Sequence, residues 1–263
     1  MNKSFYNLHP KQGLFNHHCP GLYTLLFLLF LALSAASCSK EQLPSPEPEA
    51  GIPPPIPDTV RYLALGDSYT IGQSVTYQGR WPVQLANQLR AVFPDTVYYI
   101  EEPDIVARTG WTTGNLLQAI AVADTLQPPY DLVSLLIGVN NQYQNRPIGL
   151  YRTEFRELLE QAISFAGDDT ARVIVLSIPD YAFTPFGQSS SDPGRTSKQI
   201  DLYNAINLEI TDSYGVAYFD ITPISRQGLA QPELVAPDGL HPSGAMYAGW
   251  VEELIDYVVG VLE

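Results

Sequence analysis

Cysteine is almost absent from this chain of 263 residues, which contains only Cys19 and Cys38. Both precede the stretches that are expected to fold, so no disulfide bond can staple the folded part together. Hydrophobic residues make up 45% of the sequence and charged residues 16%, which is typical of a packed globular protein rather than a disordered one. Stability must therefore come from a hydrophobic core.

Basic residues are also scarce. Lysine and arginine number 14 against 28 aspartate and glutamate residues, which gives a formal net charge of -14. This balance argues against a nucleic-acid partner, because phosphate backbones are bound by clustered cations. The length suits one sizeable α/β domain with a leader.

Histidine occurs four times, at His9, His17, His18 and His241. The first three lie in a segment that we expect to be removed, which leaves His241 as the single histidine of the mature chain. One histidine without a cysteine cluster does not make a metal site, and no glycine-rich nucleotide-binding pattern is present. We therefore expect no metal and no other cofactor.

The N-terminal stretch is typical of an export signal. Its first 21 residues carry two lysines and no acid, the apolar run 22–33 follows, and small residues lead to Cys38. The run is short for a membrane span. The arrangement resembles a bacterial lipoprotein signal, in which the cysteine becomes the lipidated first residue, although Ala35 stands where the common pattern has leucine. An uncut signal anchor is the alternative.

Residues 38–58 are rich in proline, with seven prolines between residues 44 and 57. Such a segment is extended and semi-rigid, as a spacer between a membrane and a domain would be. We therefore predict a signal peptide over 1–37, a linker over 38–58 after the lipidated cysteine, and a domain over 59–263. The predicted location is the cell envelope, on a bacterial membrane through the lipid anchor, periplasmic or surface-exposed. Removal of the two leader lysines would change the net charge from -14 to -16.

From residue 60 onward, short apolar runs alternate with longer amphipathic stretches. The apolar runs predict five strands, at 62–65, 97–100, 132–137, 173–178 and 216–219. The amphipathic stretches predict five helices, at 81–93, 112–126, 151–165, 197–214 and from the capping residue Ser243 onward. This alternation predicts an α/β fold, a doubly wound three-layer α/β/α domain with a five-stranded parallel sheet. Ligands bind outside the carboxyl ends of the strands in such sheets.

Residues that could take part in catalysis follow the predicted strands. Ser68 comes after the first, Gly110 after the second and Asn140 after the third, while Asp238 and His241 share the loop before the last helix. A serine hydroxyl is a poor nucleophile near neutral pH and needs a base to take its proton. Histidine suits this role, and an aspartate can fix its tautomer, as in serine triads.

The segments Gly66-Asp-Ser68, Gly110, Gly138-Val-Asn140 and Asp238-Gly-Leu-His241, in this order, resemble the four blocks of the SGNH (GDSL) hydrolase family. The resemblance spans about residues 61–262. It implies a flavodoxin-like sheet and an esterase or lipase type of reaction. It also implies an oxyanion hole made by the backbone N–H groups of Ser68 and Gly110 and the side-chain amide of Asn140.

One position departs from the family pattern. The third block usually reads Gly-x-Asn-Asp, and Asn141 replaces the acid here. We expect altered hydrogen bonding in the loop rather than lost activity. Asp67 is expected to brace the serine turn. The polar stretch 184–197 is predicted to be a mobile flap that sets substrate choice.

These features predict an exported serine esterase that cleaves acyl esters through an acyl-enzyme on Ser68. The expected substrates carry short acyl or acetyl groups, on glycans or small molecules. A lysophospholipase or thioesterase of the same family is the nearest enzymatic alternative. The alternative from another class is a surface lipoprotein that binds glycan without catalysis.

Overall fold

The computed structural model describes residues 57–263. The predictions for the signal peptide, for Cys38 and for most of the linker lie outside these residues. The described part contains a five-stranded parallel sheet in the order β4-β2-β5-β6-β7. Its strands are β2 (Tyr62–Gly66), β4 (Asp104–Ala107), β5 (Leu132–Leu136), β6 (Val173–Leu176) and β7 (Ala217–Phe219).

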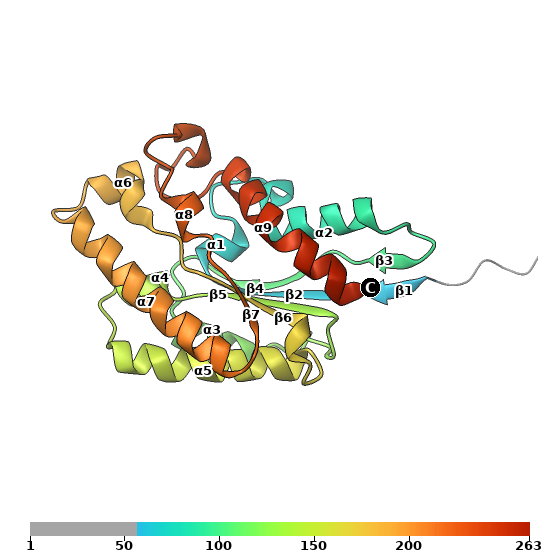
Figure 1. The fold of residues 1–263 in the computed structure, drawn as a ribbon. Helices are drawn as coiled ribbons and strands as arrows, with labels where there is room; N and C mark the ends of the chain where they lie inside the picture. Colours follow the sequence, from blue (N-terminus) through green and yellow to red (C-terminus); the bar gives the residue numbers. More distant parts are fainter. Residues whose placement is uncertain (1–56) are drawn as a thin grey trace, which may run out of the picture. The chain divides into compact units, whose positions relative to one another are not determined.

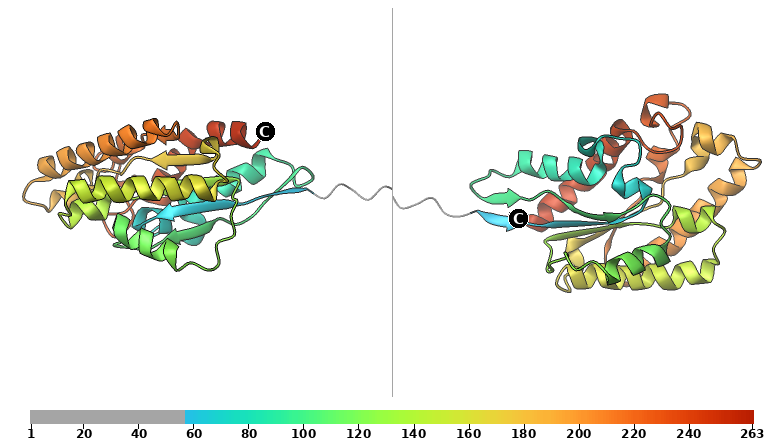
Figure 2. Two further views of the ribbon diagram at one scale, coloured as in Figure 1. Left: turned by 90° about the horizontal axis from the view of Figure 1, so that it is seen from below. Right: turned by 180° about the vertical axis from the view of Figure 1, so that it is seen from behind.

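Helices cover both faces of this sheet (Figures 1 and 2). On one face, α2 packs against α9, and on the other α5 packs against α3 and α7. Their bounds are α2 (Trp81–Val92), α3 (Thr113–Ala121), α5 (Ile148–Phe165), α7 (Pro193–Ser213) and α9 (Gly244–Leu262). The predicted doubly wound α/β/α fold with five parallel strands is therefore confirmed. Among the described residues, no helix is long and apolar enough to span a bilayer.

The core lies where the sheet meets these helices. The central strand β5 is buried along its whole length, as its continuous apolar run predicts. Trp81 of α2 and Trp250 of α9 are fully buried. Pro82 occupies the first turn of α2, where its missing N–H costs no intrahelical hydrogen bond.

Short helices gather near the carboxyl ends of the strands, on the side where ligands bind in such sheets (Figure 1). They are α1 (Ser68–Ile71), α4 (Val139–Tyr143), α6 (Pro185–Gln188) and α8 (Thr222–Ser225). Single 3₁₀ turns complete the connections, namely η1 (Tyr77–Gly79), η2 (Thr170–Arg172), η3 (Tyr181–Phe183) and η4 (Pro232–Leu234).

The prediction for the second strand of the sheet is wrong. The segment at 97–100 forms β3 (Tyr98–Ile100), which pairs only with β1 (Asp58–Val60) in a separate two-stranded sheet. The edge strand next to β2 is β4 instead. This strand is only partly buried, and its apolar run covers only residues 105–107, fewer than in the central strands.

Three helix boundaries differ from prediction by three residues or more. Helix α3 ends at Ala121 rather than at residue 126, α5 begins at Ile148 rather than at residue 151, and α7 begins at Pro193 rather than at residue 197. Asp192 caps α7 by accepting the N–H of Arg195 at 2.9 Å. With α6 and its caps inside the same stretch, only residues 190 and 191 of the predicted flap lie outside a helix or its cap, so the expectation of a long polar loop is wrong.

Candidate functional site

Ser68 is the first residue of α1, directly after β2 and the capping residue Asp67. The turn depends on Gly66, because a Cβ there would lie 2.1 Å from the Thr70 Oγ1 and 2.5 Å from the Leu136 carbonyl oxygen. The Ser68 N–H opens the first turn of α1, so it has no intrahelical acceptor. The sharp strand-to-helix turn that the sequence predicts is therefore present.

Asp67 braces this turn from inside. Its buried side chain accepts the backbone N–H of Tyr69 at 3.0 Å. Burial raises the pKa of Asp67 to about 7, against the lowering effect of hydrogen bonds from backbone N–H groups, including that of Gly138. These contacts agree with a structural role for Asp67.

Asp238 and His241 form a hydrogen-bonded pair. The Asp238 Oδ2 lies 2.7 Å from the His241 Nδ1, and its Oδ1 accepts the backbone N–H groups of Leu240 and His241 at 3.0 Å each. The Ser74 hydroxyl donates to the same Oδ2 at 2.5 Å. Partial burial raises the pKa of Asp238, but the hydrogen bonds from Ser74, His241 and Leu240 outweigh it and hold the pKa well below its usual range.

The pair lies against the helix that carries Ser68. The ring of Tyr69, the next residue, lies edge-on to the His241 ring with 5.7 Å between centroids. In the part of the chain that the structure describes, no hydrogen bond joins the Ser68 hydroxyl to the imidazole. Such bonds are often long in unliganded enzymes and tighten when substrate binds.

Gly110 and Asn140 also lie side by side. The Asn140 Nδ2 donates to the carbonyl of Trp111 at 2.9 Å, and the Gln144 Nε2 donates to the carbonyl of Gly110 at 3.2 Å. Gly110 has φ of +86°, which a glycine adopts without strain. The amide of Asn140 keeps a second N–H that this contact does not use.

The turn after α1 links the two halves of the site, which the sequence did not suggest. Gln73 accepts the Thr109 hydroxyl at 2.7 Å, one residue before Gly110, and the neighbouring Ser74 binds Asp238. Ser74 has φ of +67°, an unusual value for a residue other than glycine. The sequence could not indicate this role, because polar residues in a turn look the same whether they bridge two loops or only contact solvent.

Asn141 replaces the family's acid within a small polar network. Its Oδ1 accepts the N–H of Thr113 at 3.0 Å, and its Nδ2 donates to the Thr113 hydroxyl at 2.6 Å. That hydroxyl in turn donates to the Glu154 carboxylate. Because the hydroxyl gives its only proton to Glu154, its other partner must be a donor, and an amide supplies one where an ionised aspartate cannot.

Asn141→Asp is therefore expected to lower the free energy of unfolding by about 1–3 kcal/mol at pH 8. The new carboxylate would lie near Glu154, so its pKa in the folded state would be raised above the unfolded value. The deficit should be small at pH 4 and grow as pH rises, because the folded state then loses a proton at greater cost than the unfolded state. Urea unfolding at several pH values measures this.

The double variant Asn141→Asp with Glu154→Gln should recover most of the loss, because the glutamine carries no charge. Glu157→Gln, an exposed position on the same helix, is the matched control and should restore nothing. Equal deficits at pH 4 and pH 8 would show that charge repulsion is not the cause.

A small cavity, with room for about one water molecule, lies beside the imidazole. Its lining is largely apolar and includes Tyr69, Tyr181, Leu240, His241 and Met246. It is far too small for a drug-sized ligand, which needs a pocket of roughly 300–1,000 Å³.

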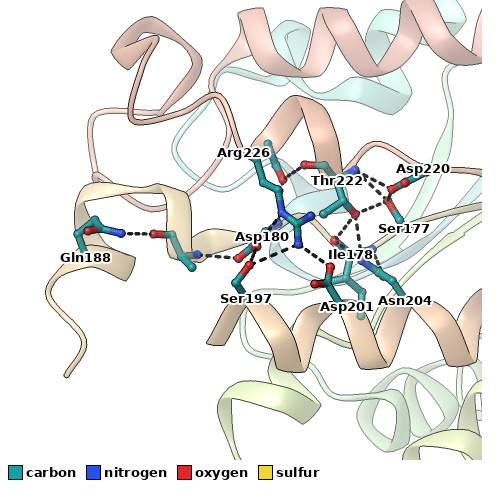
Figure 3. Close-up of polar contacts among 12 residues, drawn as sticks. Ser177, Ile178, Asp180, Gln188, Ser197, Asp201, Asn204, Asp220, Thr222 and Arg226 are labelled. Carbon is teal, nitrogen blue, oxygen red and sulfur yellow. Dashed lines mark hydrogen bonds and ion pairs between the residues drawn. The ribbon is translucent and has the colours of Figure 1, made fainter. Parts of the chain in front are cut away.

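Asp180 also lines this cavity, and its carboxylate is fully buried (Figure 3). It lies 3.0 Å from the Arg226 Nε and accepts the Ser197 hydroxyl, while its other oxygen accepts the N–H of Ala182 at 3.0 Å. Arg226 extends to Asp201 at 2.5 Å. The network joins η3, α7 and the end of α8, so Asp180 shapes the wall of the cavity as well as capping a turn.

Among residues 57–263, no group of three or more histidine, cysteine, aspartate or glutamate side chains is placed to hold a metal ion. The arrangement brings together a serine at a helix start, an imidazole paired with a carboxylate, and an amide donor beside a glycine. These are the groups that acyl transfer requires.

Solved structures share this fold. The acetylxylan esterase Axe2 from Geobacillus stearothermophilus matches with a TM-score of 0.56 and 18% identity, over 77% of this chain and 95% of that chain. The psychrotrophic esterase EstA from Pseudoalteromonas sp. matches with a TM-score of 0.56 and 17% identity, over 78% of this chain and 98% of that chain. The lipase/acylhydrolase from Enterococcus faecalis matches with a TM-score of 0.56 and 22% identity, over 76% of this chain and 96% of that chain.

Comparison with curated protein sequences finds no match to this chain. A family model, however, matches residues 64–248, which include all five candidate site residues. Its description is the GDSL-like Lipase/Acylhydrolase family. The chain belongs to this family of SGNH (GDSL) hydrolases and is an enzyme that hydrolyses ester bonds.

Proposed function

We propose that the protein is a serine esterase in which Ser68 attacks the acyl carbon and forms an acyl-enzyme. His241 takes the proton of the Ser68 hydroxyl and later delivers it to the leaving alcohol, and a water then repeats the attack. Asp238 holds the imidazole in the tautomer with its proton on Nδ1. The observation that carries this proposal is the 2.7 Å contact between Asp238 and His241, packed against the helix that begins at Ser68.

The negative charge that develops on the carbonyl oxygen needs donors set in advance. The backbone N–H groups of Ser68 and Gly110 and the free N–H of Asn140 are the proposed donors. Their support is the helix-start position of Ser68 and the contact of Asn140 with Trp111, directly after Gly110.

The proposed substrates carry short acyl groups, especially acetyl groups on glycans or small molecules. The structural neighbour Axe2 is an acetylxylan esterase, which agrees with an acetylated glycan as substrate. Lysophospholipase or thioesterase activity is the enzymatic alternative, and glycan binding without catalysis is the other.

The test is hydrolysis of p-nitrophenyl acetate, p-nitrophenyl octanoate and acetylated oligosaccharides, with Ser68→Ala as the control. Acetyl esters should react faster than octanoate, and the variant should be nearly inactive. A preference for octanoate would favour the lysophospholipase alternative. Equal rates for the wild-type protein and Ser68→Ala would favour glycan binding without catalysis.

The proposed location is the cell envelope, with Cys38 lipidated after removal of residues 1–37. The proline-rich segment that follows Cys38 supports a spacer of this kind. Cys38→Ser should move the protein from the membrane fraction to the soluble fraction in cell fractionation. Retention in the membrane fraction would favour the uncut signal anchor instead.

A further inference from the structure

Two exposed aromatic side chains, Tyr143 and Phe186, lie next to each other and have no role in the proposed catalytic steps. They are 56% and 40% exposed, and their ring centroids are 6.3 Å apart. The buried ring of Tyr181 lies 6.2 Å from Tyr143 and 6.4 Å from Phe186, so the three form one aromatic cluster. Exposed apolar side chains gathered in this way are typical of a binding surface.

The aromatic cluster is attached to the elements that carry the candidate site. Tyr143 ends α4, three residues after Asn140 on the same short helix. The backbone N–H of Phe186 donates to the Gly239 carbonyl at 2.9 Å, within the loop that carries the aspartate–histidine pair. Tyr181 lines the cavity that the imidazole also lines. The aromatic cluster is therefore connected to the helix that carries Asn140 and to the loop that carries the aspartate–histidine pair.

The segment that carries Phe186 is fixed in place. The Gln188 Nε2 donates to the carbonyl of Ala182 at 2.8 Å (Figure 3), and the Thr184 hydroxyl accepts the N–H of Gly187 at 3.0 Å. Preset rings bind with a smaller loss of conformational entropy than mobile ones do. The stretch that the sequence suggested as a flap thus presents an aromatic face on a helix that these hydrogen bonds hold to the preceding turn.

The polar groups beside the aromatic cluster are the amides of Gln142 and Gln144 and the guanidinium of Arg146, which donates to the Gln144 Oε1 at 3.3 Å. The Gln142 Oε1 accepts a hydrogen bond from the Tyr181 hydroxyl at 2.9 Å, and its Nε2 donates to the Gln199 Oε1 at 2.8 Å. The Gln144 Nε2 donates to the Gly110 carbonyl. An amide both donates and accepts, as sugar hydroxyls do. An aromatic face is apolar and carries partial negative charge, so it suits the C–H face of a pyranose ring.

We infer that Tyr143 and Phe186 form a subsite that stacks against a pyranose ring of an acetylated glycan, next to the acetyl ester under attack. The inference rests on the proposed esterase function and names the alcohol half of its substrate. In this arrangement the acetyl ester lies at Ser68 and the imidazole, and the sugar lies on the aromatic cluster.

The test compares kcat and KM on p-nitrophenyl acetate with those on acetylated xylose-, mannose- and glucosamine-based oligosaccharides. Tyr143→Ala and Phe186→Ala should each lower the ratio of kcat/KM for the best glycan ester to that for p-nitrophenyl acetate by about tenfold, mainly through a higher KM. Tyr143→Phe and Phe186→Tyr, which keep the rings, should retain most of the ratio.

Tyr99→Ala is the matched control, because Tyr99 is 55% exposed on β3, at the other end of the sheet from α4 and α6 (Figure 1). It should leave both rates unchanged. Equal losses on both kinds of ester, or a selective loss on p-nitrophenyl octanoate, would overturn the subsite. So would a wild-type protein that cleaves p-nitrophenyl acetate but no glycan ester. Inactivity on every ester would instead contradict the esterase proposal itself.

Discussion

Ser68→Ala is expected to lower kcat/KM for p-nitrophenyl acetate by about 10⁴-fold or more, and His241→Ala by a similar factor. The serine supplies the atom that bonds to the acyl carbon, and the histidine supplies the base, so the loss of either stops the same step. The double variant Ser68→Ala with His241→Ala should be no slower than the slower single variant, because the rate losses from substituting residues that act as one unit do not add. Release of p-nitrophenol measures all three rates.

Labelling of the nucleophile provides an independent readout. A fluorophosphonate should add to the wild-type protein once, at Ser68, and should not add to Ser68→Ala, as measured by intact-protein mass spectrometry. Ser164→Ala, an exposed position on α5, is the matched control and should be labelled and active like wild type. Additive losses in the double variant, or labelling at another serine, would place the chemistry elsewhere.

The central strands and the long helices could be predicted because their burial dictates their sequence. Strand β5 is covered on both faces and reads as a nearly continuous apolar run, and the buried positions of α5 recur at helical spacing. Edge strands carry a weaker signal. Strand β4 begins with exposed Asp104 and is only partly buried, as β3 is, so the sequence does not show which of the two joins the sheet.

The candidate residues could be identified from type and order, but their supports could not. His241 stands out because it is the only histidine after residue 18. The bridges from Gln73 and Ser74 depend on how three loops meet in space, with up to 164 residues between partners. The amide at Asn141 has a reason only once Glu154 is seen to take the proton of the Thr113 hydroxyl.

Asp238→Asn should lower kcat/KM by about 10⁴-fold while the protein stays folded, as the corresponding change does in a serine protease. In the proposed wild-type arrangement, the Asp238 Oδ2 accepts a hydrogen bond from the N–H at Nδ1 of His241, which leaves the Nε2 free to take the serine proton. Because hydrogen bonds hold the pKa of Asp238 well below its usual range, the carboxylate stays ionised at every pH useful for the assay. An asparagine amide can donate to Nδ1 instead and favour the tautomer with the proton on Nε2.

The ¹⁵N chemical shifts of the His241 ring report the tautomer directly, and the spectrum of His241→Ala assigns them. The proton should lie on Nδ1 in wild type and on Nε2 in Asp238→Asn. Ser74→Ala removes another hydrogen bond to the same oxygen without changing the charge, so its loss should be only about 2- to 12-fold, equivalent to 0.5–1.5 kcal/mol. An inactive Asp238→Asn that keeps the wild-type tautomer would mean that the carboxylate acts through its charge rather than by orienting the ring.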